Sequence, residues 1–147
     1  MRKIPFPQAN NLQLIYDIFI TLDYNGTSKF EVMEKCKLTE REAAYYLDAL
    51  QYLGLVNKQK MRYFLNNEGE GIKNLLEGST KRVFALKILE NPFLRELYDK
   101  SKLFINKKEC QEYIAGRIAE KESLNVITSM RRASTVVSWF TWVDKYK

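Results

Sequence analysis

The sequence predicts a mainly α protein with a small β-hairpin, and three observations lead to this fold class. The 147 residues are 46% hydrophobic with only six Gly and three Pro, which is typical of a chain with a core and few extended linkers. Apolar residues recur at helical spacing along most of the chain. One pair of short β-type runs flanks a polar, basic turn.

The first two helices are indicated by their capping residues. A helix is expected over residues 10–22, with Asn10 or Asn11 as its cap, because the apolar residues that follow repeat every three to four positions. A second helix is expected after Thr27 or Ser28.

The third helix and the hairpin complete a recognisable order. Thr39 and Glu42 form a capping box at the start of the helix, and Gly54 marks its end. Residues 55–56 and 63–65 are expected to be the two strands. Three helices followed by a hairpin is the order of a winged helix, in which the hairpin is the wing.

A short helix capped by Asn67 and running to Leu76 is expected to close the first unit, residues 1–78. The second unit, residues 79–147, predicts a less regular winged-helix-like or helix-turn-helix arrangement packed in tandem on the first. The first expected elements are a helix capped by Thr80, a helix starting at Asn91-Pro92 and a strand at 103–105. A helix capped by Asn106, a short helix capped by Ser123 and a last helix over about 131–144 follow.

The net positive charge lies entirely in the second unit. Residues 1–78 hold 10 basic and 10 acidic residues, whereas residues 79–147 hold 14 basic and 8 acidic ones. Such an asymmetry is typical of a protein in which one half binds a polyanion. The alternative is that the additional basic residues belong to an ordinary solvent-exposed surface.

The last helix separates into two faces. Its core face carries Trp139 and Val143 among other apolar residues, and the opposite face carries small hydroxyl side chains behind an arginine pair. No Asp or Glu occurs from residue 123 to residue 143, where a carboxylate would repel phosphate. The helix is expected to lie in the major groove of duplex DNA. Its predicted DNA-contacting residues are Arg131, Arg132, Ser134, Thr135 and Ser138. The alternative is that the hydroxyls pack against another protein helix.

The first unit offers weaker candidates. Lys58, Lys60 and Arg62 lie within five residues of the wing and are predicted to contact a phosphate backbone, with a solvated hairpin as the alternative. Arg41 is the one basic candidate on the third helix, whose outward positions are mainly acidic.

Catalysis is not expected. The chain has no His, which removes the commonest general base, and its two Cys are too few for a zinc site. No Gly-rich phosphate loop is present. We therefore predict a protein that is not an enzyme and needs no cofactor or metal, while a metal-dependent nuclease assembled from scattered carboxylates stays open.

The sequence lacks an apolar run of roughly 18 residues, and residues 1–7 lack the apolar stretch of a signal peptide. A cytoplasmic protein without a membrane partner is expected.

The last helix also carries a resemblance. The segment from residue 130 to residue 143, MRRASTVVSWFTWV, resembles the closing helix of winged-helix modules found beside type II restriction endonuclease domains, where an Arg-Arg, a Thr and a Ser-Trp with a second Trp recur at this spacing. The resemblance implies a tandem winged-helix protein that binds double-stranded DNA in a restriction–modification or other defence system, with a nuclease or other protein subunit as a partner. An adaptor for protein interaction or dimerisation is the alternative function.

Overall fold

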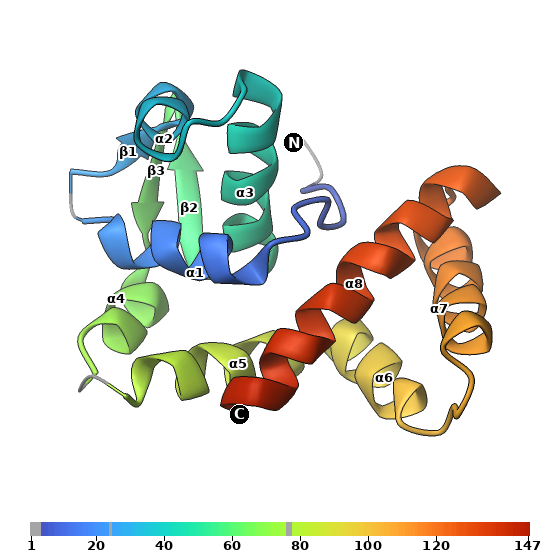
Figure 1. Cartoon of the computed structure of the whole chain (residues 1–147). Helices are drawn as coiled ribbons and strands as arrows, with labels where there is room; N and C mark the ends of the chain where they lie inside the picture. The colour runs from blue at the N-terminus through green and yellow to red at the C-terminus, as the bar shows by residue number, and fades with distance from the viewer. Residues whose placement is uncertain (1–3, 24, 76–77) are drawn as a thin grey trace.

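The computed structural model describes residues 4–23, 25–75 and 78–147. Among these residues it confirms the mainly α fold class, with eight helices and one small antiparallel sheet (Figure 1). In chain order the elements are α1 (Leu12–Thr21), β1 (Thr27–Ser28), α2 (Lys29–Cys36), α3 (Glu40–Tyr52), β2 (Val56–Gln59), β3 (Arg62–Leu65), α4 (Asn67–Lys73), α5 (Thr80–Glu90), α6 (Pro92–Ser101), α7 (Lys107–Glu122) and α8 (Val126–Tyr146). Within the described ranges, none of these helices combines the length and apolarity needed to cross a membrane.

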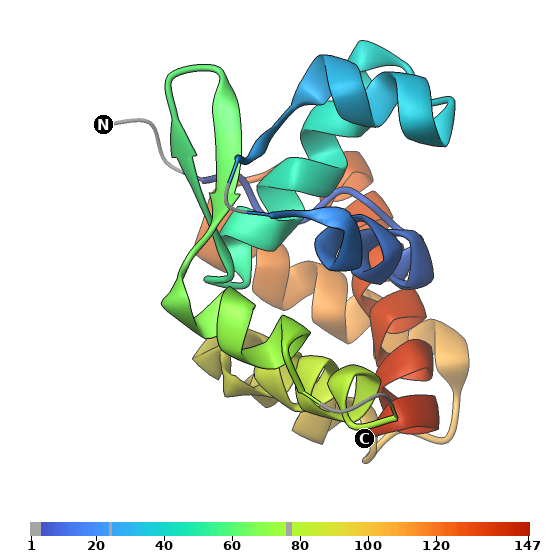
Figure 2. The same ribbon diagram turned by 90° about the vertical axis from the view of Figure 1, so that its left-hand side faces the viewer.

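The first half has the expected order of three helices and a wing. Strands β2 and β3 form an antiparallel hairpin, which we call the wing, and residues 60–61 make its turn. The sheet order is β1-β3-β2, so the short strand β1, which the sequence did not indicate, pairs with β3 at its open edge. Figure 2 shows the wing standing beside α3.

Local capping chemistry places the helices of this half. Asn11 and Ser28 cap α1 and α2 as expected, and the Thr39–Glu42 capping box at the start of α3 is complete. Asn66, one residue before the expected cap, caps α4. The expected end of α4 at Leu76 lies outside the described residues.

The second half is helical throughout, because residues 78–147 are all described and none of them is in a strand. The strand expected at residues 103–105 is wrong: these residues belong to the loop between α6 and α7, where Leu103 and Ile105 are exposed and have no neighbouring strand to pair with. Thr80 begins α5 rather than capping it. Asn91 caps α6 and Asn106 caps α7 as expected.

The last helix is longer than expected. Ser123 does not cap a separate short helix, because it has a left-handed backbone (φ 54°) and ends α7 instead. Asn125 then caps one continuous helix of 21 residues, α8. No Gly or Pro interrupts the sequence between Val126 and Tyr146, so nothing divides this helix.

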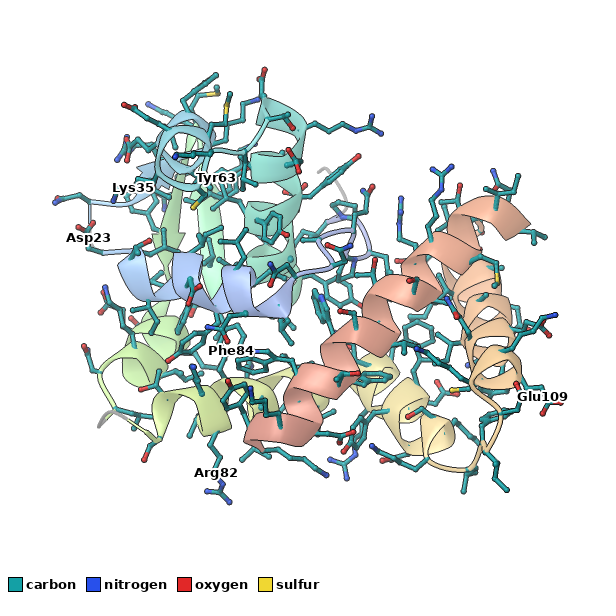
Figure 3. All side chains as sticks on the ribbon, viewed as in Figure 1. Asp23, Lys35, Tyr63, Arg82, Phe84 and Glu109 are labelled. Carbon is teal, nitrogen blue, oxygen red and sulfur yellow. The ribbon has the colours of Figure 1, made fainter. Side chains whose placement is uncertain are left out.

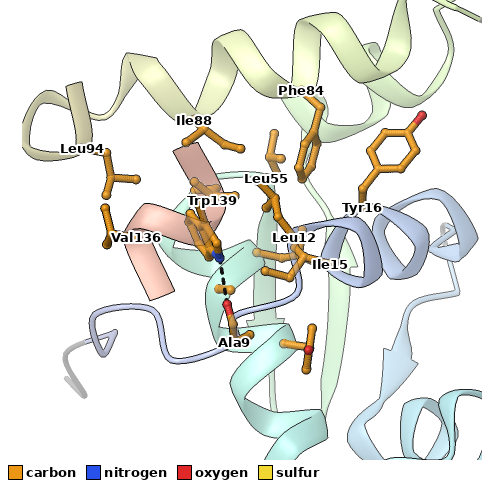
Figure 4. Packing of buried hydrophobic residues seen from close by; sticks show 14 of the residues in the cluster. Ala9, Leu12, Ile15, Tyr16, Leu55, Phe84, Ile88, Leu94, Val136 and Trp139 are labelled. Carbon is orange, nitrogen blue, oxygen red and sulfur yellow. Dashed lines mark hydrogen bonds between the residues drawn. The ribbon is translucent and has the colours of Figure 1, made fainter. Parts of the chain in front are cut away.

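Helix α8 connects the two halves through the hydrophobic core. It packs along α7 and also contacts α5 and α1. Trp139 is fully buried, and its indole Nε1–H donates to the carbonyl of Ala9, 2.8 Å away (Figure 4). The rings of Tyr16, Phe84 and Trp142 meet between α1, α5 and α8. A core that continues from one half into the other fits tandem packing, and the boundary near Gly78 stays a prediction.

Candidate nucleic-acid interface

A cleft of about 670 Å³ lies between the start of α3, the first half of α8 and the segment that precedes α1. Five of the predicted contact residues line it, and the three arginines among them, Arg41, Arg131 and Arg132, come from both halves of the chain. We call it the arginine cleft. Its lining residues are Gln8, Asn10, Arg41, Tyr45, Thr128, Arg131, Arg132, Ser134 and Thr135.

The capping box of α3 places Arg41 in the cleft. The backbone N–H of Thr39 donates to the Glu42 carboxylate (3.0 Å), and this bond lowers the pKa of Glu42. Arg41 is therefore held in a fixed first helical turn, and its Nε–H donates to the hydroxyl of Tyr45 one turn further on. The guanidinium also lies 5.6 Å from the centre of the Tyr45 ring.

The electrostatics of the cleft favour an anionic ligand. Burial lowers the pKa of Arg132, and the positive charges of Arg131 and Arg41 lower it further, while Tyr45 opposes the shift. No carboxylate is among the lining residues. A partly buried guanidinium that faces two others gains from any anion that enters between them.

The three arginines of the cleft have no carboxylate partner, in contrast to Arg62, Arg95 and Arg117 elsewhere in the described chain. Within residues 4–23, 25–75 and 78–147, Arg41, Arg131 and Arg132 take part in no ion pair. The cationic residues that do form ion pairs there are Lys29, Arg62, Lys87, Arg95, Lys102 and Arg117.

Two predicted contact residues of α8 are placed differently from the expectation. Thr135 is buried (5% exposed), and its hydroxyl donates to the carbonyl of Arg131 within the helix, so it does not belong to an open face. The hydroxyl of Ser138 donates to the carbonyl of Asn10 (3.0 Å), which corresponds to the alternative of hydroxyls packing against protein. Ser134 is exposed at the edge of the cleft. Within the arginine cleft, the open part of the predicted face is therefore the turn from Arg131 to Ser134.

The wing contains one structural arginine and two exposed lysines. Arg62 forms an ion pair with Glu31 (3.0 Å) and donates to the carbonyls of Asn25 and Gly26, so its guanidinium ties the wing to the start of α2. These contacts occupy the group that was predicted to contact DNA. Lys58 and Lys60 are exposed.

The outer face of α3 lies between the arginine cleft and the wing. Arg41 and Tyr45 border the cleft, whereas Ala44 and Asp48 border a smaller hollow that they share with Lys58 of the wing. These four helix positions fall within an arc of about 100°. The arginines of α8 and the lysines of the wing thus flank one face of α3, with the buried carboxylate of Asp48 between them.

Four lining residues of the cleft were not among the predicted contacts: Gln8, Asn10, Tyr45 and Thr128. Gln8 and Asn10 belong to the segment before α1, which folds back over α8 and is held by Trp139 and Ser138. The side chains that hold it are about 130 residues away in the sequence, so helical spacing gives no sign of this contact. Among the described residues, no three Cys, Asp or Glu side chains gather as a metal site.

Fold and cleft together define a small, mainly α protein with a winged first half and a basic cleft between its halves. The chain belongs to a family described as a domain of unknown function, DUF7226, whose model matches residues 14–147. No curated protein matches the chain. No solved structure matches it either. The family description assigns no activity, so function has to be inferred from the site.

Proposed function

We propose that this protein binds double-stranded DNA, with the arginine cleft and the wing holding phosphates on the two sides of α3. The observation that carries the proposal is the meeting of Arg41, Arg131 and Arg132 in a cleft without a carboxylate lining. Guanidinium groups bind phosphate oxygens through paired hydrogen bonds, and phosphate contacts supply most of the affinity of DNA-binding proteins.

The proposed docking differs from the expectation that α8 lies in the major groove. The middle of α8 is against residues 9 and 10, as the bonds from Ser138 and Trp139 show. The face of α3 between the cleft and the wing is the surface proposed to meet the duplex. The buried Asp48 in that face disfavours close phosphate approach at its centre, so contacts are expected at the two flanks.

The test is fluorescence anisotropy with a blunt duplex of about 20 base pairs across a salt series. Each lost phosphate contact is expected to reduce the slope of log K against log salt by about 0.9, so Arg131→Ala/Arg132→Ala should reduce it by nearly 2. Lys107→Ala/Lys108→Ala is the matched control, because it removes the same charge from the exposed start of α7, outside the cleft. Absence of binding at low salt, or equal slopes for both variants, would exclude the proposal.

A protein-interaction adaptor is the second candidate, favoured by exposed apolar residues at the start of α8. Val126 and Ile127 are 76% and 70% exposed, whereas the hydroxyl of Ser138 and the indole of Trp142 bond to the chain's own residues. If the protein is an adaptor, it should form a stable oligomer or complex, and the mass of this species by light scattering should be the same at low and high salt. The roles in restriction–modification or defence, a nuclease partner and a cytoplasmic location remain predictions from the sequence.

A further inference from the structure

We propose that the arginine cleft opens into a groove for one unpaired nucleic-acid strand, so that the protein prefers a duplex with a single-stranded extension over a blunt duplex. This inference rests on the proposed duplex binding, because the unpaired strand leaves the duplex at the cleft. The groove, which we call the strand groove, runs between α8 and α1.

Three neighbouring hollows make up the strand groove. The arginine cleft shares Asn10 with a second hollow of about 530 Å³, which lies between α1 and α8 and is lined by Gln13, Ser138 and Lys145 among others. A third hollow of about 740 Å³ follows at the far end of α8, where Tyr146 meets Lys81 and Arg82 of α5. Figure 3 shows Arg82 pointing away from the ribbon at this end.

The residues of α8 that face the groove repeat at alternating steps of three and four: Arg131, Ser134, Ser138, Thr141 and Lys145. This spacing places them in one row along the helix. At a rise of about 1.5 Å per residue, the row is about 21 Å long. It begins and ends with a cation, and small hydroxyl side chains lie between.

Charge and aromatic rings along the groove fit a nucleic-acid strand. The described lining residues of the three hollows include seven cations and a single carboxylate, Asp17. Tyr45, Trp142 and Tyr146 also line them, and each of these rings is partly exposed. A basic groove with aromatic rings is how proteins bind single strands, because phosphates follow the cations and bases stack on the rings.

The contact between the walls of the groove fits one strand rather than a duplex. Its two walls are in contact at the floor, since Ser138 bonds to the Asn10 carbonyl and the indole of Trp142 donates to Gln13 (2.9 Å). Packed helices are separated by about 8–10 Å between axes. A duplex, whose major groove alone is about 12 Å wide, cannot reach this floor, whereas a single strand can.

Cations at the far end remain available for a strand. Lys81 lies 4.7 Å from the centre of the Tyr146 ring and 5.7 Å from that of Tyr16. Among the described residues, neither Lys81 nor Lys145 forms an ion pair. Their removal should therefore weaken strand binding without disturbing the arginine cleft.

The experiment compares a blunt duplex of about 20 base pairs with the same duplex carrying an oligo-dT tail of about 12 nucleotides. The tailed duplex should bind at least about fivefold more tightly, since stacking of a single base contributes about this factor or more. Lys81→Ala/Lys145→Ala should remove most of the advantage and leave the affinity for the blunt duplex within about twofold. Lys107→Ala/Lys108→Ala is again the control of equal charge and should keep the advantage.

A second measurement does not depend on variants that alter charge. Oligo-dT of about 12 nucleotides should quench the tryptophan fluorescence of the protein, and Trp142→Phe should reduce the quenching, because Trp139 is fully buried. Equal affinity for the tailed and blunt duplexes would overturn this inference and leave duplex binding intact. Failure to bind either duplex would overturn both proposals.

Discussion

Replacing Trp139 by Phe tests whether the segment before α1 is held on α8 by the indole hydrogen bond. Trp139 is fully buried, and its Nε1–H lies 2.8 Å from the carbonyl oxygen of Ala9. Phe removes the donor and leaves a carbonyl without its partner in the core. That change is expected to cost about 1–3 kcal/mol.

The smaller ring adds a second contribution. Phe is smaller than Trp by roughly 40 Å³, so the substitution leaves a cavity in the core. At about 24 cal/mol per Å³ of cavity, this lowers the free energy of unfolding by about 1 kcal/mol. The sum, about 3 kcal/mol, corresponds to a decrease in Tm of roughly 6–12 °C for a chain of this size.

The assay is thermal and urea unfolding followed by circular dichroism, with Trp142→Phe as the matched control. The indole of Trp142 bonds to the partly buried side chain of Gln13 rather than to a core carbonyl, so this variant should lose about 1 kcal/mol. A loss below 1 kcal/mol for Trp139→Phe, or equal losses for the two variants, would refute the proposed role of the bond to Ala9.

Three further predictions concern α3, the wing and α8. Thr39→Ala should destabilise the protein by about 1 kcal/mol in urea unfolding, because the capping box of α3 loses its side-chain acceptor; an unchanged midpoint would contradict this. Arg62→Ala should lower the free energy of unfolding by about 1–2 kcal/mol, because it removes the bonds to Glu31 and two carbonyls. The variant should leave the salt slope of duplex binding unchanged, whereas loss of a phosphate contact would reduce that slope by about 1. Burial raises the pKa of Asp144, but the hydrogen bonds from Lys102 and Tyr98 outweigh burial and hold the pKa below 3.8. The ionised carboxylate therefore stabilises the folded state above pH 3.8, and this stabilisation disappears as the pH falls through the pKa of the folded protein. Asp144→Asn should therefore lower the free energy of unfolding by about 1 kcal/mol at pH 7, with allowance for solvent screening, and by progressively less below pH 3.8. A difference in unfolding free energy that stays constant with pH would contradict a stabilising interaction of Asp144 with Lys102 and Tyr98.

Local features of the fold were predictable from the sequence. The Thr39–Glu42 capping box and the helix starts at Asn91 and Asn106 depend on residues three positions apart, and the structure places all of them as expected. The wing was predictable for the same reason, because its strands are separated by only a short turn.

Errors arose where a local pattern has two structural meanings. Ser123 is a frequent N-cap residue type, yet here it has a left-handed backbone at the end of α7. Leu103 and Ile105 form a short apolar run of the kind found in strands, but the nearby chain supplies no partner strand and both side chains are exposed. A run of three residues is too short for its pattern to separate a strand from a loop.

The candidate site was predictable only in part. Arg131 and Arg132 were indicated by an acid-free helix, and Arg41 was the basic candidate of α3, but nothing in the spacing indicated that they meet. The contacts that bring them together, from Ser138 to Asn10 and from Trp139 to Ala9, join residues about 130 positions apart. Such contacts depend on tertiary packing, which periodicity within a single helix does not describe.

The two walls of the arginine cleft are far apart in the sequence, so the ribosome synthesises them at different times. Gln8, Asn10 and Arg41 leave the ribosome well before the residues of α8 that complete the cleft. A nascent chain that has folded only its first half therefore lacks Arg131 and Arg132, and it also lacks Trp139, which holds residue 9 in place. Under the proposed function, we therefore expect a partly made chain to bind nucleic acid only weakly until α8 has docked.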